Sequence, residues 1–197
     1  MTLYCATTNA GKIAEFRMAA CGPLAIEPLP GLADILPCDE TGVTFEENAV
    51  EKALYYGSRT SGWLFAEDSG LEVDALNGAP GVYSARYADP GATDESNNAL
   101  VLERLGSSMQ RSARFVCVIA LAHAGRVVKT FRGTVEGEIL HSPRGPNGFG
   151  YDPIFYYPPF GCSFGEVDRE RKQTVSHRGA ALRLLCGFLK PESIRSV

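Results

Sequence analysis

The first third of the chain alternates between apolar runs and a helical stripe. Residues 2 to 6 form an apolar run that predicts a strand, and Ile13 and Phe16 then begin a stripe at helical spacing behind a polar turn. Leu24 to Leu29 predict a second strand, which Pro30 and Gly31 end. The pattern therefore predicts strand, helix and strand in that order.

Three later helices are marked by polar residues that cap their first turns. Thr44 and Glu47 have the spacing of a capping box, and the helix behind them is expected to end near Ser58. Thr93 begins a helix that runs through Leu105, and Ser176 begins the last helix of the chain.

The remaining apolar runs predict further strands. Trp63 to Ala66 and Leu71 to Ala75 are expected to be two strands on either side of a polar corner, Glu67 to Gly70. Arg114 to Ala122 is almost continuously apolar, which favours a central strand, and 126–140 adds at least one more. Together these elements predict an α/β fold with a mixed sheet.

Composition limits the class of protein. The chain has 197 residues, of which 45% are hydrophobic and 21% charged, and it carries no repeat or linker, so we expect a single domain over 1–197. The net charge is -4 and the 19 Lys and Arg form no dense run, which argues against a partner nucleic acid or a polybasic membrane anchor. With no signal segment and no long apolar window, we expect a cytoplasmic protein.

The cysteines are spread through the chain without a CxxC pair, mostly within apolar runs. In a cytoplasmic protein such residues are typically reduced and serve packing. We therefore expect free thiols at all six positions, which are Cys5, Cys21, Cys38, Cys117, Cys162 and Cys186.

Thr7 to Lys12 is the first candidate site. It lies at a predicted helix start, where free N–H groups, an Asn9 cap, the small Gly11 and the Lys12 charge suit a phosphate group. The segment lacks the spacing of a Walker A loop. An ordinary capped helix after a strand is the alternative interpretation.

Acidic residues form the second candidate. Glu67 and Asp68 lie in the polar corner, and Asp39, Glu40 and Glu47 lie upstream, so adjacent carboxylates at a strand end could bind Mg²⁺ beside a substrate phosphate. A solvated turn is the alternative, because Asp-Ser-Gly is common in turns.

Two further segments combine glycine, aromatic and basic residues. Gly148 to Asp152 places aromatic rings beside glycines, which would suit stacking on a base or else a packed hinge. Ser176 to Arg178 offers donors at a helix start, and Lys172 lies shortly before it among charged residues that could equally be solvated.

Taken together, these segments resemble the inosine/xanthosine triphosphate pyrophosphatase family, whose motifs occur here in the same order over nearly the whole chain. The matching blocks are Thr8 to Lys12 with Glu15 and Phe16, Thr44 to Ala49 with Lys52 and Ala53, Asp68 to Gly70, Gly78 to Gly81 with Ser84 to Tyr87, Gly148 to Phe155, and Ser176 to Ala180. The sequence departs from the family pattern at two positions. Glu67 stands where many members have Asp, and Thr8 stands where relatives often have Gly or Asn.

The resemblance implies an elongated α/β fold, with a long mixed sheet and two lobes around a central cleft, and usually a homodimer. It also implies an Mg²⁺-dependent enzyme that hydrolyses deaminated purine triphosphates, ITP/dITP and XTP/dXTP, to the monophosphate and pyrophosphate. Asp68 would be the general base and a metal ligand, with Glu40 as second ligand. Gly78 to Tyr87 would form part of the dimer interface.

The resemblance also assigns the substrate contacts. Lys52 would be a further phosphate contact, Phe149 a stacking face, and Arg178 a donor to the keto oxygen at C6 of the base. The full set of expected substrate-binding residues is Thr7, Thr8, Asn9, Ala10, Gly11, Lys12, Ser69, Phe149, Gly150, Tyr151, Asp152, Lys172, His177 and Arg178. Two alternatives stay open, a non-catalytic nucleotide sensor and a pyrophosphatase for modified pyrimidine or methylated nucleotides.

Overall fold

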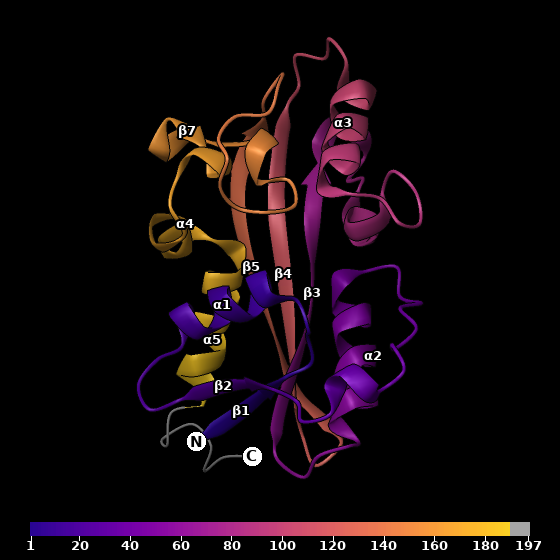
Figure 1. The fold of residues 1–197 in the computed structure, drawn as a ribbon, viewed down its shortest axis with the longest axis vertical. Coiled ribbons are helices and arrows are strands. Elements are labelled where there is room, and N and C mark those ends of the chain that lie inside the picture. Colours follow the sequence, from indigo (N-terminus) through magenta and orange to yellow (C-terminus); the bar gives the residue numbers. More distant parts are fainter. Residues whose placement is uncertain (190–197) are drawn as a thin grey trace. The chain divides into compact units, whose positions relative to one another are not determined.

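The computed structural model describes residues 1–189, and Figure 1 shows their fold. Its helices and strands confirm the predicted α/β class. The strands are β1 (Thr2–Cys5), β2 (Ala25–Pro28), β3 (Trp63–Val73), β4 (Ser112–His123), β5 (Arg126–Ile139), β6 (Phe155–Tyr157) and β7 (Cys162–Ser163). The α-helices are α1 (Ala10–Ala19), α2 (Phe45–Gly57), α3 (Asp94–Leu105), α4 (Arg169–Val175) and α5 (His177–Phe188).

The strands form one mixed sheet in the order β2-β1-β3-β4-β5-β6-β7. β1 runs parallel to both β2 and β3, whereas β5, β6 and β7 pair antiparallel. The chain contacts divide into two compact units. Among the described residues, the first holds 1–68, 117–133 and 176–189, and the second holds 69–116 and 134–175.

In the first unit, helices cover both faces of the strands. α1 and α5 lie on one side of β3 and α2 lies on the other (Figure 1). Phe65 of β3 belongs to the larger core, with Phe16 of α1 and Leu182 of α5, whereas its neighbour Leu64 packs with Tyr56 of α2. Successive side chains of a strand point to opposite faces, and both faces of β3 are therefore buried.

The second unit has a core of its own. Phe115, Phe155 and Phe164 stack or tilt against one another, and Val101 of α3 packs in the same cluster. The aromatic packing fixes the strands and short turns that follow β5, among them the loop of residues 148–152.

The predicted helix caps are confirmed. The Thr44 hydroxyl accepts from the Glu47 N–H, and the Glu47 carboxylate accepts from the Thr44 N–H, so the capping box is complete. The Thr93 and Ser176 hydroxyls likewise accept backbone N–H groups in the first turns of α3 and α5. These short-range signals located the three helix starts because a cap involves only neighbouring residues.

The predicted corner at Glu67 to Gly70 is wrong. β3 continues without a break from Trp63 to Val73, so the polar residues lie inside a buried strand. Turn composition is a local preference, and it is overridden here because the buried carboxylates of Glu67 and Asp68 have cationic partners.

A 3-10 helix spans Gly81–Arg86. Two other expectations need correction. Helix α4 was not predicted, and its Lys172 is buried, not solvated. A disulfide joins Cys21 to Cys186, so the expectation of six reduced cysteines holds only for the other four. Among residues 1–189, no helix has the length and apolarity to cross a membrane.

Candidate active site

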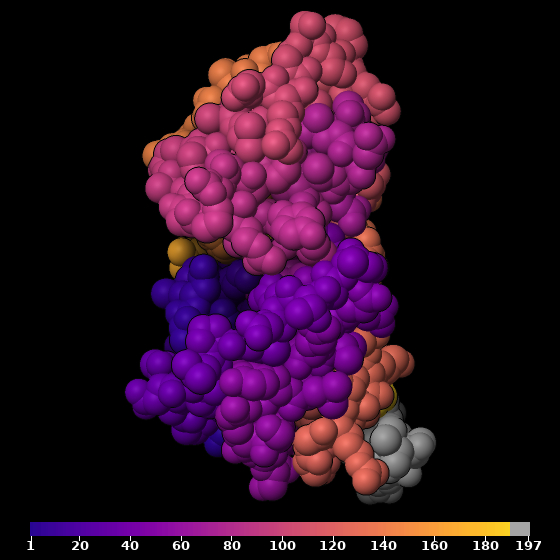
Figure 2. All heavy atoms as spheres, turned by 90° about the vertical axis from the view of Figure 1, so that its right-hand side faces the viewer, coloured from indigo at the N-terminus to yellow at the C-terminus, as the bar shows by residue number. Residues whose placement is uncertain are grey.

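The first unit places a cavity at the carboxyl end of β1. The connection from β1 leads through α1 to β2, whereas β3 lies on the other side of β1, so the strand order reverses at this point. Open α/β sheets bind ligands at such a position. The cavity has a volume of about 330 Å³ and its polar lining includes Thr7, Thr8 and Lys12. In Figure 2 the surface is hollowed between the indigo atoms of the first residues and the purple atoms of α2.

The turn between β1 and α1 has the geometry of an anion site. The Asn9 side chain accepts from the Lys12 N–H at 3.0 Å, and the Asn9 N–H donates to the Thr7 hydroxyl at 3.2 Å. These bonds form the first turn of α1, and Thr8, Asn9 and Ala10 remain exposed. A helix start with exposed residues favours a bound anion.

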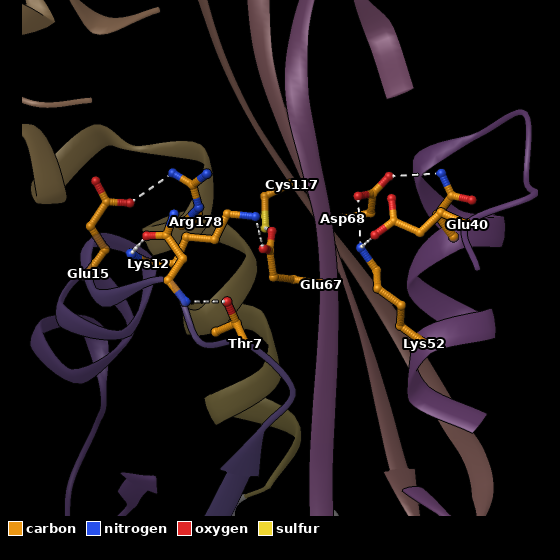
Figure 3. A network of polar contacts seen from close by, with 11 residues as sticks. Thr7, Lys12, Glu15, Glu40, Lys52, Glu67, Asp68, Cys117 and Arg178 are labelled. Atoms are coloured by element: carbon orange, nitrogen blue, oxygen red, sulfur yellow. Dashed lines mark hydrogen bonds and ion pairs between the residues drawn. The ribbon is translucent and has the colours of Figure 1, made fainter. Parts of the chain in front are cut away.

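Glu67 and Asp68, two consecutive acidic residues of β3, face opposite sides of the strand (Figure 3). Glu67 points to the side of α1 and its Oε1 lies 2.5 Å from Lys12 Nζ. Asp68 points to the side of α2 and its Oδ1 lies 2.9 Å from Lys52 Nζ. Because side chains alternate along a strand, the expectation that adjacent acids share one site is wrong for this pair.

Glu67 is buried and ionised. Burial alone would raise its pKa, but Lys12, Arg178 and Lys52 outweigh this effect and lower the pKa of Glu67 to about 2. On its other side the Cys117 thiol lies 3.8 Å from Glu67 Oε2, and burial raises the pKa of that thiol, which keeps it a protonated donor. The Glu67 carboxylate thus holds the Lys12 ammonium in place.

The other face of β3 carries a second group of charges. Lys52 Nζ donates to Asp68 Oδ1 at 2.9 Å and to Glu40 Oε1 at 3.0 Å, while Asn48 Nδ2 donates to Asp68 Oδ2 at 3.2 Å. Burial lowers the pKa of Lys52, but Asp68, Glu67 and Glu40 outweigh it and raise the pKa above its ordinary value. Burial raises the pKa of Asp68, with Lys52 opposing this rise.

Two of these carboxylates suit a hard cation. Within residues 1–189 no group of three or more His, Cys, Asp or Glu forms a metal cluster. Glu40 and Asp68 nevertheless converge on the same point, the Lys52 ammonium. Mg²⁺ is usually held by one or two carboxylates together with substrate phosphates and water, so this donor set fits that ion. Glu47 does not belong to it, since its carboxylate serves the cap of α2.

Arg178 and His177 lie in the first turn of α5, both buried. Arg178 Nη1 donates to Glu15 Oε2 of α1 at 2.9 Å. Burial lowers the pKa of Arg178, but Glu15 and Glu67 outweigh it and raise the pKa. A Cβ at Gly133 of β5 would lie 2.2 Å from the His177 carbonyl oxygen, so only glycine allows this approach.

The second unit brings together the other predicted substrate residues. Lys172 Nζ donates to Asp152 Oδ2 at 2.6 Å, and the Phe149 N–H donates to the same oxygen at 3.0 Å. Lys172 Nζ also lies 4.9 Å from the centre of the Phe149 ring. Gly148 has a φ of +78°, and a Cβ there would lie 2.2 Å from Asp152 Oδ2.

The flanking residues of this loop are anchored by hydrogen bonds. The Tyr151 hydroxyl donates to the Ser84 carbonyl at 2.6 Å. Gly150 donates from its N–H to Asp94 and accepts at its carbonyl from Asn98 of α3. Residues 149–152 are therefore fixed by contacts within their own unit. Ser69 follows Asp68 on β3 and is partly exposed.

Comparison with known proteins identifies the class to which this arrangement belongs. The sequence model that describes the Ham1 family matches residues 3–188 of this chain. The chain belongs to the Ham1 family. This membership confirms the resemblance found in the sequence.

Relatives of this Ham1 chain match it over nearly its whole length. A dITP/XTP pyrophosphatase of Exiguobacterium is 50% identical and covers 94% of this chain and 95% of its own. One from Staphylococcus aureus strain Mu50 is 43% identical, with 95% of each chain covered. Among solved structures, the Staphylococcus aureus Ham1 protein has a TM-score of 0.88 at 42% identity, covering 98% of this chain and 100% of its own. A Coxiella burnetii HAM1 protein has a TM-score of 0.86 at 40% identity, with 96% and 98% covered.

Sequence reasoning about this Ham1 chain missed two residues beside the candidate site. Asn48 bonds to Asp68, and Glu15 bonds to Arg178. Asn48 gave one signal, because asparagine is unfavourable inside a helix and its presence there calls for a partner. Glu15 gave no comparable signal, since its partner lies 163 positions away in the sequence.

Proposed function

We propose that this Ham1 chain is a nucleoside triphosphate pyrophosphatase that hydrolyses deaminated purine nucleotides such as dITP and XTP to the monophosphate and pyrophosphate. Relatives that match almost end to end carry the name dITP/XTP pyrophosphatase. The observation that carries the proposal is the buried Asp68 carboxylate with Lys52 and Asn48 on its two oxygens.

Asp68 is proposed as the general base. Each carboxylate oxygen has two lone-pair sites, so its bonds to Lys52 and Asn48 leave acceptor positions for a water. Burial raises the pKa of Asp68, which makes the carboxylate a better proton acceptor than an exposed one. The water oxygen would bond to the α-phosphorus, its proton would pass to Asp68, and the bond from the α-phosphorus to the bridging oxygen would break.

The leaving pyrophosphate takes the electrons of the broken bond and gains negative charge. Lys12 and Lys52 are the cations proposed to neutralise it, together with the backbone N–H groups of Thr8, Ala10 and Gly11. Glu67 would act through Lys12, which it holds at 2.5 Å, and would not touch the substrate.

Glu40 and Asp68 are the residues that would hold Mg²⁺. When bound, Mg²⁺ supplies positive charge to the phosphate oxygens. Glu40 is favoured over Glu67 as the second ligand because it shares the face of β3 to which Asp68 points, with Lys52 as their common partner. Thr7, Thr8 and Lys12 line the same cavity as Glu40 and Lys52.

The nucleoside contacts are proposed for two segments. Phe149 offers a ring for stacking, with Gly150, Tyr151, Asp152 and Lys172 forming the rest of the loop site. Ser69 is a proposed substrate contact as well. His177 and Arg178 are proposed to read the base edge, since Arg donors match the keto oxygen at C6 of hypoxanthine and xanthine but face the amino group of adenine.

A homodimer in the cytoplasm completes the proposal. Residues 78–87 are proposed as part of the interface, and Tyr83 supports this choice because it is a large aromatic side chain with 57% of its surface exposed. Sedimentation showing only species of 21.2 kDa would remove the dimer.

A substrate panel tests the proposed function. Pyrophosphate release with Mg²⁺ is measured side by side for ITP, XTP, GTP, ATP, UTP and a methylated purine triphosphate. The highest kcat/KM for ITP or XTP supports the proposal. A higher value for UTP or the methylated nucleotide would indicate a different pyrophosphatase, and binding without any pyrophosphate release would indicate a sensor.

A further inference from the structure

Asn48 lies on α2 beside the charges of Lys52 and Asp68, and it contacts the loop that carries Glu40. It is the fourth residue of α2 and its side chain is almost completely buried, with 1% exposed. Asparagine disfavours a helix interior because its amide competes for backbone bonds. Such a residue persists in a buried helical position when both ends of its amide have specific partners.

Both partners of Asn48 are defined. Its Oδ1 accepts from the Gly42 N–H at 2.8 Å, and its Nδ2 donates to Asp68 Oδ2 at 3.2 Å. A backbone N–H can only donate, so the amide oxygen must face Gly42 and the NH₂ group must face Asp68. The orientation of the amide is therefore set by the loop, and it presents a donor to the carboxylate.

Gly42 is required for this contact. A Cβ at this position would lie 2.7 Å from Asn48 Oδ1 and 2.6 Å from Glu47 Cβ, both closer than side chains approach. Glu40 lies two residues before Gly42 and reaches Lys52, which is one helical turn after Asn48. Asn48 and Lys52, on one face of α2, therefore both bond to Asp68. The same two side chains also hold the loop of Glu40, Asn48 through the Gly42 N–H and Lys52 through Glu40.

We infer that Asn48 is a positioning residue for the hydrolysis, because its amide fixes the Asp68 carboxylate and the loop of Glu40 in one arrangement. The inference rests on the proposed function of Asp68 and adds a residue to it. Asn48 itself would touch neither the nucleotide nor the attacking water. Its removal should therefore slow the chemical step more than it weakens nucleotide binding.

Two substitutions separate the two ends of the amide. Asn48→Asp keeps the shape and the acceptor for the Gly42 N–H, but it replaces the donor to Asp68 by an oxygen. Asn48→Ala removes both bonds and is compatible with a helix. Asn97→Asp is the matched control, since Asn97 is also buried in a helix, accepts from the Ala88 N–H and donates to the Ala85 carbonyl.

The first readout is kinetic, with ITP and Mg²⁺ as substrate and the α,β-methylene analogue of ITP as binding probe. Asn48→Asp is expected to lower kcat by about 10- to 100-fold while the Kd of the analogue changes by less than about threefold. Asn97→Asp is expected to leave kcat within about twofold of the original, at a comparable loss of thermal stability. An Asn48→Asp protein with unchanged kcat, or with kcat and Kd impaired equally, would overturn the inference.

The second readout is hydrogen exchange of the Gly42 amide. Asn48→Ala should lose its protection, whereas Asn48→Asp should keep it. If Asn48→Asp fails to fold, Asn48→Ala carries the kinetic test with the same expected split between kcat and Kd. Failure of the proposed function is distinguishable, because then the original protein would release no pyrophosphate from ITP and Asp68→Asn would change nothing.

Discussion

Glu67 and Asp68 are consecutive residues of β3, and their carboxylates bind lysines on opposite faces of that strand. Glu67 holds Lys12 beside the start of α1, whereas Asp68 meets Lys52 of α2. The two acids therefore have different partners and different proposed roles, although they are adjacent in the sequence and carry the same charge.

This difference predicts a kinetic contrast between two conservative substitutions. Glu67→Gln should raise KM for ITP about fivefold with kcat within about threefold, since the Lys12 ammonium loses its ionic anchor. Asp68→Asn should lower kcat by about a thousandfold or more with little effect on KM, because it removes the proton acceptor. Steady-state pyrophosphate release measures both. Glu27→Gln, which alters an exposed acid paired with Arg17, is the control and should be neutral. Equal effects of the two test substitutions would contradict the assignment.

Glu67 also predicts how stability depends on pH. Its pKa falls from 4.5 to about 2 on folding, because the cations around it outweigh burial. A lowered pKa means that the stabilisation is complete above pH 4.5 and is lost as the pH falls toward 2. At roughly 1.4 kcal/mol per pH unit the loss is about 3 kcal/mol. Urea unfolding of the original protein and Glu67→Gln should show this extra loss only in the original. Parallel curves for both proteins would contradict it.

The buried pair of Lys172 and Asp152 predicts a stability effect in the second unit. The two residues have 4% and 1% of their surface exposed. Lys172→Met removes the cation from a buried carboxylate and should cost about 3–5 kcal/mol. Asp152→Asn in the same protein should restore a large part of this loss. Arg169→Met, an exposed substitution on the same helix, should change stability by less than about 0.5 kcal/mol. A loss of the same size for Arg169→Met would contradict the role of the pair.

The disulfide between Cys21 and Cys186 predicts a redox-dependent stability. The bond joins residues 165 positions apart, so closing this loop would stabilise the fold by up to about 5 kcal/mol in the chain-entropy model. Cys21→Ser should unfold at lower denaturant than the original without reductant, and both should agree in excess dithiothreitol. Six reactive thiols in the unreduced, denatured original would show that the bond is absent.

Local signals in the sequence predicted much of the fold. Apolar runs located β1, β2 and β4, and the hydroxyl caps of Thr44, Thr93 and Ser176 located three helices, because each signal involves residues that are close in the chain. The corner at Glu67 failed for the opposite reason. Nothing near Glu67 in sequence reveals that Lys12 pairs with it across the fold, and without that pairing a buried acid in a strand is unfavourable.

The candidate site likewise has parts that local sequence signals predict and parts that they do not. Helix-start signals made Thr7 to Lys12 a candidate phosphate site, with an ordinary capped helix as the alternative. The convergence of Glu40 and Asp68 on Lys52, by contrast, joins three separate segments. Spacing alone does not predict such a convergence, and the family resemblance implied only that Glu40 and Asp68 would both bind the metal. The resemblance supplied no role for Asn48, whose contacts become visible only when the Gly42 amide and Asp68 are both placed.

The most direct test of the central claim is pyrophosphate release from ITP and ATP by the original protein and by Asp68→Asn, at matched Mg²⁺ concentration. We expect the original to release pyrophosphate from ITP with kcat/KM about a hundredfold or more above that for ATP, and Asp68→Asn to keep its fold and lose at least about 99.9% of the ITP rate. Release of single phosphate groups in place of pyrophosphate, or near-normal turnover by Asp68→Asn, would contradict the account.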